Sequence, residues 1–218
     1  MTITNASSKI RPNFASNPLL QILLVAYAGV WIWAAINPVY RFDWFLENIL
    51  TVLVIAALAA TYRRFPLSDV SYTLIFIFMV MHAVGAHYTY SEVPLGSWLK
   101  DTFELSRNHY DRIVHFSFGL LLAYPFKEVV WRIAINNNLL STLFALTLVF
   151  TYSGSFEIIE WIIARIVDPK AGAAYLGTQG DEFDSQKDMV LAVSGALITL
   201  GLVAVFSTKA KGKSLQDD

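Results

Sequence analysis

The sequence predicts an all-α fold: a polytopic bundle of about six transmembrane helices. Hydrophobic residues make up 56% of the 218 residues and charged residues only 15%, whereas an average soluble domain is about 25% charged. The apolar residues also come in long blocks, each near the roughly 17–25 residues that a helix needs to cross a bilayer. Cysteine is absent, which excludes disulfides, thiolate metal sites and a cysteine nucleophile. No basic stripe suggests nucleic-acid binding.

Six apolar blocks follow one another along the chain, and we predict one spanning helix for each. A polar tail of residues 1–17 comes first and is expected to be disordered. The first block is too long for the core of a signal peptide and lacks a clear cleavage site, so we expect it to be retained. The fourth block is the weakest, because a proline and two charged residues shorten its apolar core. The predicted spans cover residues 19–36, 44–62, 70–88, 113–131, 139–167 and 189–207.

The distribution of charge predicts the orientation of these helices. Six spans place both termini on one side of the membrane, and nine of the 16 Lys and Arg residues then lie on that side, in short loops and tails. Only four of the 17 acidic residues do so. Because basic residues close to span ends stay in the cytoplasm, we expect residues 18–207 to form one membrane domain and the tails 1–17 and 208–218 to be cytoplasmic.

This orientation brings the ionisable residues of four helices to the outer side of the bilayer. Inserting an acidic residue at the centre of a membrane helix is unfavourable by about 2.5–3.5 kcal/mol on insertion scales. Acidic residues inside a span are therefore expected to have a function. We predict that they meet in one pocket that opens outward. The residues concerned are His82, His87, His109, His115, Glu157, Glu160, Asp181, Asp184 and Asp188.

Glu157 and Glu160 lie inside the fifth apolar block, three residues apart, so both project from one helix face. Two carboxylates in a medium of low dielectric share a proton, pair with a cation or bind a metal. A structural interpretation is an ion pair with Arg112 or Arg165 that fixes helix packing. The functional interpretation is favoured, because intramembrane acids usually serve a function.

Asp111 and His115 are spaced by one helical turn and share a face. A carboxylate can hold an imidazole in one tautomer, either for proton transfer or for metal ligation. A structural interpretation stays open beside it: Asn108 or Asp111 caps the helix, and His115 is a packed core residue. Among the remaining histidines, His87 lies closer to water than His82.

The segment 177–188 carries Asp181, Asp184 and Asp188 at spacings of three and four, which would form one acidic stripe on a helix. Part of this signal is structural, because the helix dipole favours acids in a first turn and Asp181 suits an N-cap. The spacing matches neither an EF-hand nor a phosphate-binding loop. In the last span, Gly195 and Gly201 are expected to allow close helix packing.

Four separated motifs carry a family resemblance. They are HAVGAHYTYSEVP (82–94), NHYDRIVHFSFGLLL (108–122), SFEIIEW (155–161) and YLGTQGDEFDSQKDM (175–189). Together they resemble the YjdF-like bacterial inner-membrane proteins, a family defined by a domain of unknown function. The resemblance covers all six spans. It implies a multi-pass protein of the bacterial inner (plasma) membrane and brings no established activity.

The layout is also similar, more distantly, to VanZ-like membrane proteins, which are linked to glycopeptide resistance and the cell envelope. In those proteins an Asp-x-x-x-His opens one helix, a Glu lies late in the next, and an Asp precedes a glycine-containing last helix. The corresponding residues here are Asp111 with His115, Glu157 or Glu160, and Asp184 or Asp188 with Gly195. The added histidines and the 177–188 segment depart from that pattern.

Three functions are compatible with these residues. The first is an enzyme that uses a divalent metal, namely Zn, Mn or Fe, on a lipid-linked or envelope substrate. Its catalytic residues would be Asp111, His115, Glu157 and Glu160, and its metal-binding residues would be His87, His109, Asp181, Asp184 and Asp188. The second is a small-solute or proton-coupled transporter, although no inverted repeat is visible. The third is a non-enzymatic scaffold or sensor. Membrane lipids are the expected partners of each.

Overall fold

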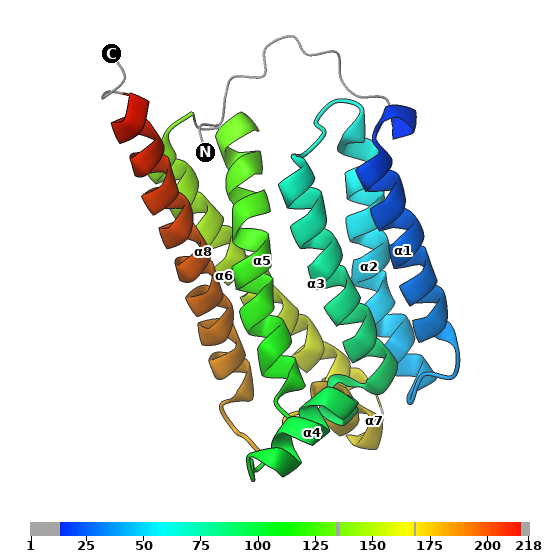
Figure 1. Ribbon diagram of the computed structural model, residues 1–218. Coiled ribbons are helices and arrows are strands. Elements are labelled where there is room, and N and C mark those ends of the chain that lie inside the picture. The colour runs from blue at the N-terminus through cyan, green and yellow to red at the C-terminus, as the bar shows by residue number, and fades with distance from the viewer. Residues whose placement is uncertain (1–13, 134–135, 168, 215–218) are drawn as a thin grey trace.

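The structure, a computed structural model, describes residues 14–133, 136–167 and 169–214, and it confirms the all-α bundle (Figure 1). Within these ranges six helices are long and apolar enough to cross a membrane. They match the six predicted spans in order. Their bounds are α1 Pro18–Ala35, α2 Arg41–Tyr62, α3 Asp69–Tyr88, α5 Tyr110–Ile133, α6 Asn138–Ile166 and α8 Asp184–Ser214.

Local capping explains where several of these helices begin. Asn17, Ser68 and Asn137 precede α1, α3 and α6, and each side-chain oxygen accepts a hydrogen bond from a backbone N–H in the first turn. Helices α2, α5 and α8 instead begin with a polar turn before the apolar block. Hydropathy therefore predicted these three starts too late. Helix α8 also continues past residue 207, the predicted end of the membrane domain.

Short helices occupy the connections. Helices α4 (Pro94–Thr102) and α7 (Pro169–Leu176) lie below the bundle in Figure 1, at the end away from the termini. The 3-10 turn η2 (Tyr90–Glu92) links α3 to α4. A further 3-10 turn, η1 (Phe14–Ser16), lies at the end of the N-terminal tail. The rest of that predicted tail, residues 1–13, lies outside the described residues.

Helix α5 stands in the middle of the bundle and contacts α3, α6 and α8. One buried cluster, which includes Phe78 and Val114, joins it to α1 and α3. A second cluster, which includes Ala123, Val149 and Ala196, joins it to α6 and α8. The second cluster is built mainly from small residues, which let these helices approach closely as membrane helices commonly do.

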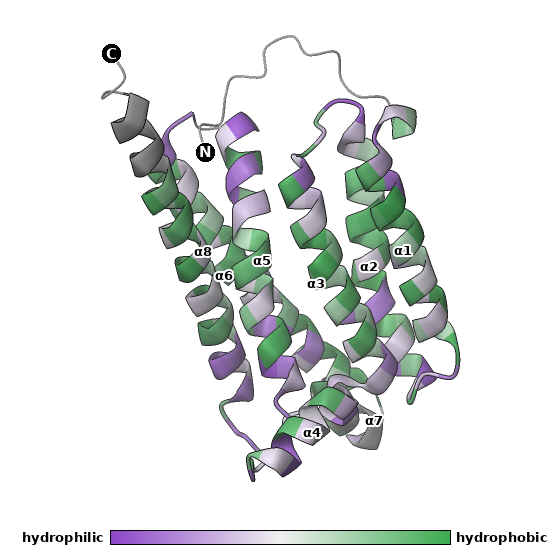
Figure 2. Ribbon diagram, in the orientation of Figure 1, coloured by the Kyte–Doolittle hydropathy of each residue, from purple (hydrophilic) through white to green (hydrophobic). Residues whose placement is uncertain are grey.

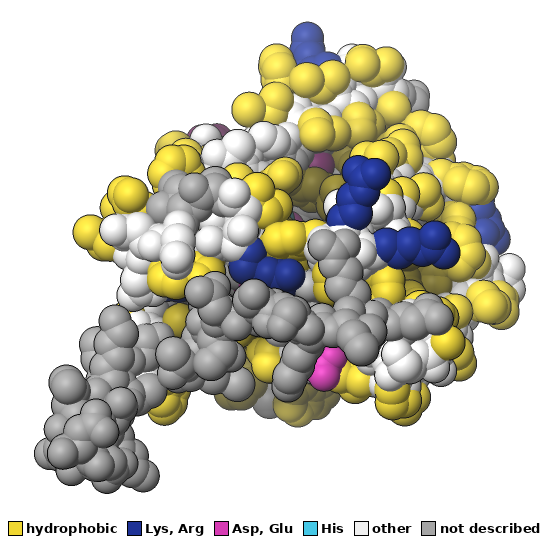
Figure 3. Space-filling view, turned by 90° about the horizontal axis from the view of Figure 1, so that it is seen from above, with side chains coloured by type: hydrophobic (Ala, Val, Ile, Leu, Met, Phe, Trp, Pro, Cys, Tyr) yellow, Lys and Arg dark blue, Asp and Glu magenta, His cyan; other side chains and the backbone are white. Residues whose placement is uncertain are grey.

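The outer surface of the bundle is apolar, and polar residues gather toward its two ends (Figure 2). Ile22, Leu53, Ile158 and Leu197 are all more than half exposed on different helices, as expected for side chains that face lipid. Figure 3 looks onto the end near the termini, where Lys and Arg side chains stand out among hydrophobic ones.

Two charged residues of the weak fourth span are buried and hydrogen-bonded. Lys127 donates hydrogen bonds to the side chains of Asn138 and Thr142 on α6. Glu128 accepts hydrogen bonds from Ser68 and Ser71 at the start of α3. Because buried polar groups persist only when they are hydrogen-bonded, these contacts explain how α5 keeps two ionisable residues within its span.

Candidate functional site

The ionisable residues predicted to converge all lie toward the end of the bundle away from the termini, but only some of them come together. Helices α2, α5 and α8 begin there, and α3 and α6 end there. Asp43, Asp111 and Asp184 lie in the first turns of α2, α5 and α8. The positive ends of three helix dipoles therefore face this region and stabilise negative charge in it.

The His115 cluster, which we define as Asp111, His115, Glu157 and Asp188, joins α5, α6 and α8. The Nε2 atom of His115 lies 3.3 Å from Oε1 of Glu157 and 3.6 Å from Oδ1 of Asp111. Potential ligand atoms of Asp111, His115 and Asp188 all lie within 4.8 Å of one another. This distance is short enough for one metal ion to reach all three.

Two carboxylates of the His115 cluster each have one oxygen without a hydrogen-bond donor in the described part of the chain. Asp188 is 2% exposed, and its Oδ1 accepts no hydrogen bond from the described residues. Glu157 is 8% exposed, and its Oε1 is also without a hydrogen bond from them. A buried carboxylate in this state is destabilised unless a cation or a proton compensates it.

Asp181 and Asp184 are engaged differently, because arginines bind them. Arg107 forms a two-pronged ion pair with Asp184, and both side chains are 5% exposed. The Nη2 atom of Arg112 lies 2.5 Å from Oδ2 of Asp181 and 3.0 Å from Oδ1 of Asp184. The alternative in which Arg112 pairs with Glu157 or Glu160 is therefore wrong. Lys187 also binds Asp181, at 2.5 Å.

The loop between α7 and α8 is tied to the start of α5. Arg107 donates hydrogen bonds to the carbonyl oxygens of Gly177 and Thr178. The side chain of Gln179 exchanges two hydrogen bonds of 2.9 Å with the backbone of Asn108. The side chain of Asn108 in turn accepts a hydrogen bond from the N–H of Tyr110, the first residue of α5. These contacts show that the first part of the 177–188 segment positions α8 against α5.

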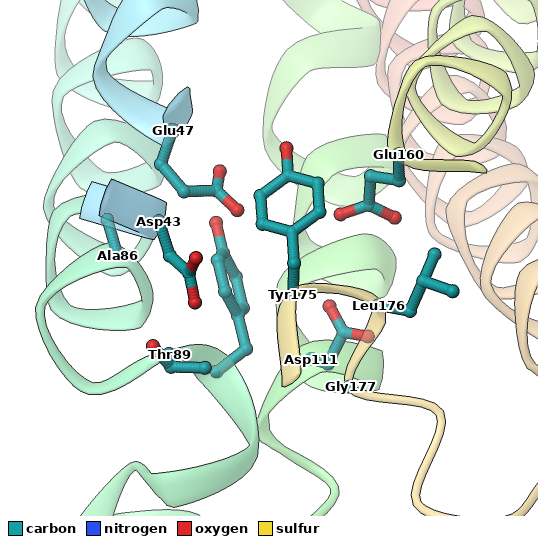
Figure 4. A pocket seen from close by; sticks show the side chains of 10 residues that line it. Asp43, Glu47, Ala86, Thr89, Asp111, Glu160, Tyr175, Leu176 and Gly177 are labelled. Atoms are coloured by element: carbon teal, nitrogen blue, oxygen red, sulfur yellow. The ribbon is translucent and has the colours of Figure 1, made fainter. Parts of the chain in front are cut away.

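A second group of carboxylates surrounds a small cavity beside the His115 cluster (Figure 4). We call it the acidic cavity, and its ionisable lining residues are Asp43, Glu47, Tyr90, Asp111, Glu160 and Tyr175. Figure 4 shows Asp43 and Glu47 facing Glu160 across the space, with Tyr175 between them. The space open to a water-sized sphere is about 10 Å³, which is room for about one water molecule.

Sequence reasoning missed part of this region. Asp43 and Glu47 were counted only as charges, although their spacing of four residues places them on one face of α2 at the level of Asp111. Their position at the same depth in the membrane as Asp111 could have identified Asp43 and Glu47 as candidate site residues. Tyr175 could not be found in this way, because it depends on α7, which hydropathy does not reveal.

Two predicted metal ligands lie apart from the His115 cluster. The ring of His87 stacks on Trp33 with centroids 4.6 Å apart, and its Nδ1 lies 3.0 Å from the Ala34 carbonyl oxygen of α1. His109 is half-buried just before α5. Burial and the nearby Arg112 and Arg107 lower the pKa of His109, so its neutral form is favoured.

Other groups outside the spans also have shifted pKa values. Hydrogen bonds from Lys187 and from the Phe183 N–H lower the pKa of Asp181, which keeps it ionised toward its basic partners. Burial, together with nearby carboxylates such as Glu47, raises the pKa of both Tyr90 and Tyr175. Both phenols therefore stay protonated. The Tyr90 hydroxyl is hydrogen-bonded to Nδ1 of His82, and the Tyr175 hydroxyl remains able to donate toward the acidic cavity.

Comparison with known proteins agrees with the fold. Residues 19–209 match the family described as "Predicted membrane protein (DUF2238)". A relative is the "Inner membrane protein YjdF" of Escherichia coli (strain K12), which is 35% identical over 192 residues that cover 88% of each chain. No solved structure matches the chain. The chain is thus an integral, multi-pass protein of the inner-membrane class, and it belongs to the DUF2238 family of membrane proteins.

Proposed function

We propose that the protein is a metal-dependent enzyme of the bacterial inner membrane, with one divalent cation held by Asp111, His115 and Asp188. The observation that carries this proposal is the 4.8 Å grouping of their ligand atoms, in which a buried Asp188 oxygen accepts no hydrogen bond from the described residues. One imidazole with two carboxylates suits Zn²⁺, Mn²⁺ or Fe²⁺. Asp181 and Asp184 are left out of this ligand set, because arginines occupy their oxygens.

Glu157 has the role of general base in this proposal. A bound divalent ion supplies Lewis acidity and brings the pKa of a bound water toward neutrality. Glu157 lies beside His115, and its Oε1 accepts no hydrogen bond from the described residues. It is therefore available to take a proton from such a water. Glu160 faces the acidic cavity instead.

The proposed substrate is a lipid-linked molecule of the cell envelope. The His115 cluster lies at the ends of the spans, where a polar head group would meet the bilayer surface. Exposed Ile158 and Trp161 on α6 and Val190 on α8 are close in sequence to Glu157 and Asp188, and they offer apolar surface for acyl chains. The excess of Lys and Arg on the side of the termini favours an outward-facing site.

Metal content tests the proposal. The full chain, purified in detergent, is expected to carry about one Zn, Mn or Fe ion per molecule. His115→Ala should reduce this content by about tenfold or more, because removing a ligand costs at least as much as the outer-shell changes that weaken metal binding by 10–100-fold. His87→Gln is the matched control, because His87 is a buried histidine that packs on α1.

Several outcomes would contradict the proposal. Wild-type protein that contains no metal and binds none at micromolar concentration leaves the His115 cluster as the packing contact of a scaffold or sensor. Loss of the folded bundle in His115→Ala, with no metal in the wild type, points the same way. Solute uptake by vesicles that Glu157→Gln abolishes would identify a transporter instead.

A further inference from the structure

We propose that a groove between α1, α2 and α3 binds an anionic phospholipid, with one acyl chain in the groove and the phosphate at Arg64. All three helices line the groove, with residues such as Leu24 of α1, Leu58 of α2 and Phe76 of α3. We call it the α1–α3 groove. No residue of the His115 cluster lines it. This inference goes beyond the proposed function, because it stands whether or not that cluster holds a metal.

The lining of the α1–α3 groove suits hydrocarbon. Among its lining residues, only Tyr27 and Tyr72 carry a polar group. The hydroxyl of Tyr72 already accepts a hydrogen bond of 3.1 Å from the Leu67 N–H. The space open to a water-sized sphere is about 60 Å³, and water is not stabilised in an apolar cavity that offers it so few partners. An apolar chain is therefore the expected occupant.

The groove is open to the lipid side of the bundle. Leu24 and Ile55 are 42% and 39% exposed, whereas Tyr27 and Tyr72 are buried. The groove thus has a buried floor and walls that reach the surface facing lipid. Leu20 and Tyr27 line it seven residues apart, which is roughly 10 Å along α1. Because the hydrocarbon core of a bilayer is about 30 Å thick, a chain from one leaflet reaches this depth.

Aromatic rings mark the end of the groove that lies nearest the termini. The ring of Tyr62, at the end of α2, contacts Phe14 before α1 and Tyr72 near the start of α3, with centroids 6.3 Å apart in both pairs. Tyrosine rings are enriched at the level of the lipid head groups. We therefore expect the acyl chain to lie in the groove and the head group to lie beside these rings.

The charge next to the rings favours an anionic head group. Arg63 and Arg64 directly follow α2, and both are exposed. Asp69 is the one acid among residues 63–69, so two arginines and one acid leave this stretch a net charge of +1. The side chain of Arg64 forms no ion pair or hydrogen bond with the described residues. Figure 3 shows Lys and Arg side chains at this end. Basic groups beside membrane helices attract anionic head groups, so Arg64 can bind the phosphate.

Lipid titration with a blocked groove tests the position of the acyl chain. The full chain, delipidated in detergent, is expected to bind about one phosphatidylglycerol in native mass spectrometry, in line with a single groove. Leu58→Trp should lose this lipid, because the larger side chain occupies the groove. Leu53→Trp is the matched control on the same helix. It should keep the lipid, because Leu53 is 61% exposed and does not line the groove.

A second comparison tests the head group. The wild type should prefer phosphatidylglycerol over phosphatidylethanolamine with the same acyl chains. Arg64→Gln should reduce this preference about fivefold, the contribution of one basic residue near a membrane surface. Arg165→Gln, an exposed substitution on α6 at the opposite end of the bundle, should leave it unchanged. Tyr27→Phe should also keep the lipid, because an acyl chain accepts no hydrogen bond.

Three results would overturn the proposal. They are a wild type without preference for phosphatidylglycerol, a folded Leu58→Trp that retains the lipid, and a folded Tyr27→Phe that loses it, which would indicate a polar ligand. Should Leu58→Trp fail to fold, Ile55→Trp gives the same comparison. If neither folds, the effect of Arg64→Gln decides. None of these results depends on Zn²⁺, so the groove and the proposed metal centre can fail separately.

Discussion

Neighbouring acids in the sequence have different partners in the structure. Asp184 and Asp188 are one helical turn apart on α8, yet Asp184 is held by Arg107 and Arg112, while Asp188 faces His115 with an oxygen that lacks a donor among the described residues. Arg107 is 77 residues away in the sequence from Asp184. Their spacing in the sequence therefore identified both acids as candidate ligands. Only the tertiary contacts show that arginines bind Asp184, whereas one oxygen of Asp188 has no hydrogen-bond donor among the residues that the structure describes.

Arg107 is expected to hold the site together. Arg107→Ala should destabilise the bundle by about 3–5 kcal/mol, because it leaves the buried Asp184 without its partner. It also removes the hydrogen bonds to Gly177 and Thr178, so the 177–183 loop should become more sensitive to protease. Thermal unfolding in detergent measures the first effect, and limited proteolysis measures the second.

Two further variants test whether the unpaired Asp184 causes the loss of stability in Arg107→Ala. Arg107→Met combined with Asp184→Leu should recover part of the lost stability, because no unpaired charge is then buried. Lys100→Met, an exposed substitution on α4, should change the Tm little. An Arg107→Ala variant as stable and protease-resistant as the wild type would show that this ion pair does not support the loop.

The predicted meeting of His115 and Glu157 is confirmed, at 3.3 Å. The prediction succeeded because both residues had to lie at the same end of adjacent spans once the number of spans was known. It failed to include Asp43 and Glu47: Asp43 lies just before the predicted second span, and Glu47 lies inside that span but was counted only as a charge. His87 was placed at the correct level, but its side chain points to α1.

At the scale of the helices, α5 and α8 pack through their glycines. A Cβ atom at Gly119 would collide with the backbone of Ala192, and one at Gly195 would collide with the backbone of Phe116. The prediction of close packing is therefore confirmed for Gly195. It is wrong for Gly201, whose Cβ position has nothing within 4 Å. Hydropathy and composition do not distinguish the two glycines. The difference depends on where α8 crosses α5, which is a property of the tertiary structure.

Glycine substitutions test this helix contact. Gly195→Ala should destabilise the protein by about 1–3 kcal/mol, because α8 must move away from α5 to admit the methyl group. Gly201→Ala is the matched control on the same helix, and it should be neutral or slightly stabilising. Thermal unfolding in detergent compares them. Equal losses in the two variants would show that backbone flexibility, and not the α5–α8 contact, determines the effect.

The spans could be predicted at this scale, but the short helices could not. Each span is a long apolar block, and the bilayer leaves a helix as its only simple fold. Helices α4 and α7 are short segments between spans, without a comparable signal. Their positions depend on contacts such as those of Asn108 with Val93 and Ser97 of the α4 segment.

The whole molecule has two chemically different ends. The end near the termini carries exposed Arg63, Arg64 and Arg132, and its buried Lys127 and Glu128 are hydrogen-bonded to Asn138 and Ser71. The opposite end gathers carboxylates in the His115 cluster and the acidic cavity. Arg107, Arg112 and Lys187 compensate Asp181 and Asp184, and the proposed metal would compensate the remaining acids of the His115 cluster.

X-ray absorption at the zinc edge tests the central claim most directly. The zinc-loaded wild-type protein should show nitrogen and oxygen ligands at about 2.0–2.2 Å with the multiple-scattering signal of one imidazole. His115→Ala should lose the imidazole signal, and His87→Gln should keep it. Zinc that lacks an imidazole ligand, or a spectrum that His115→Ala leaves unchanged, would contradict a metal centre formed by Asp111, His115 and Asp188.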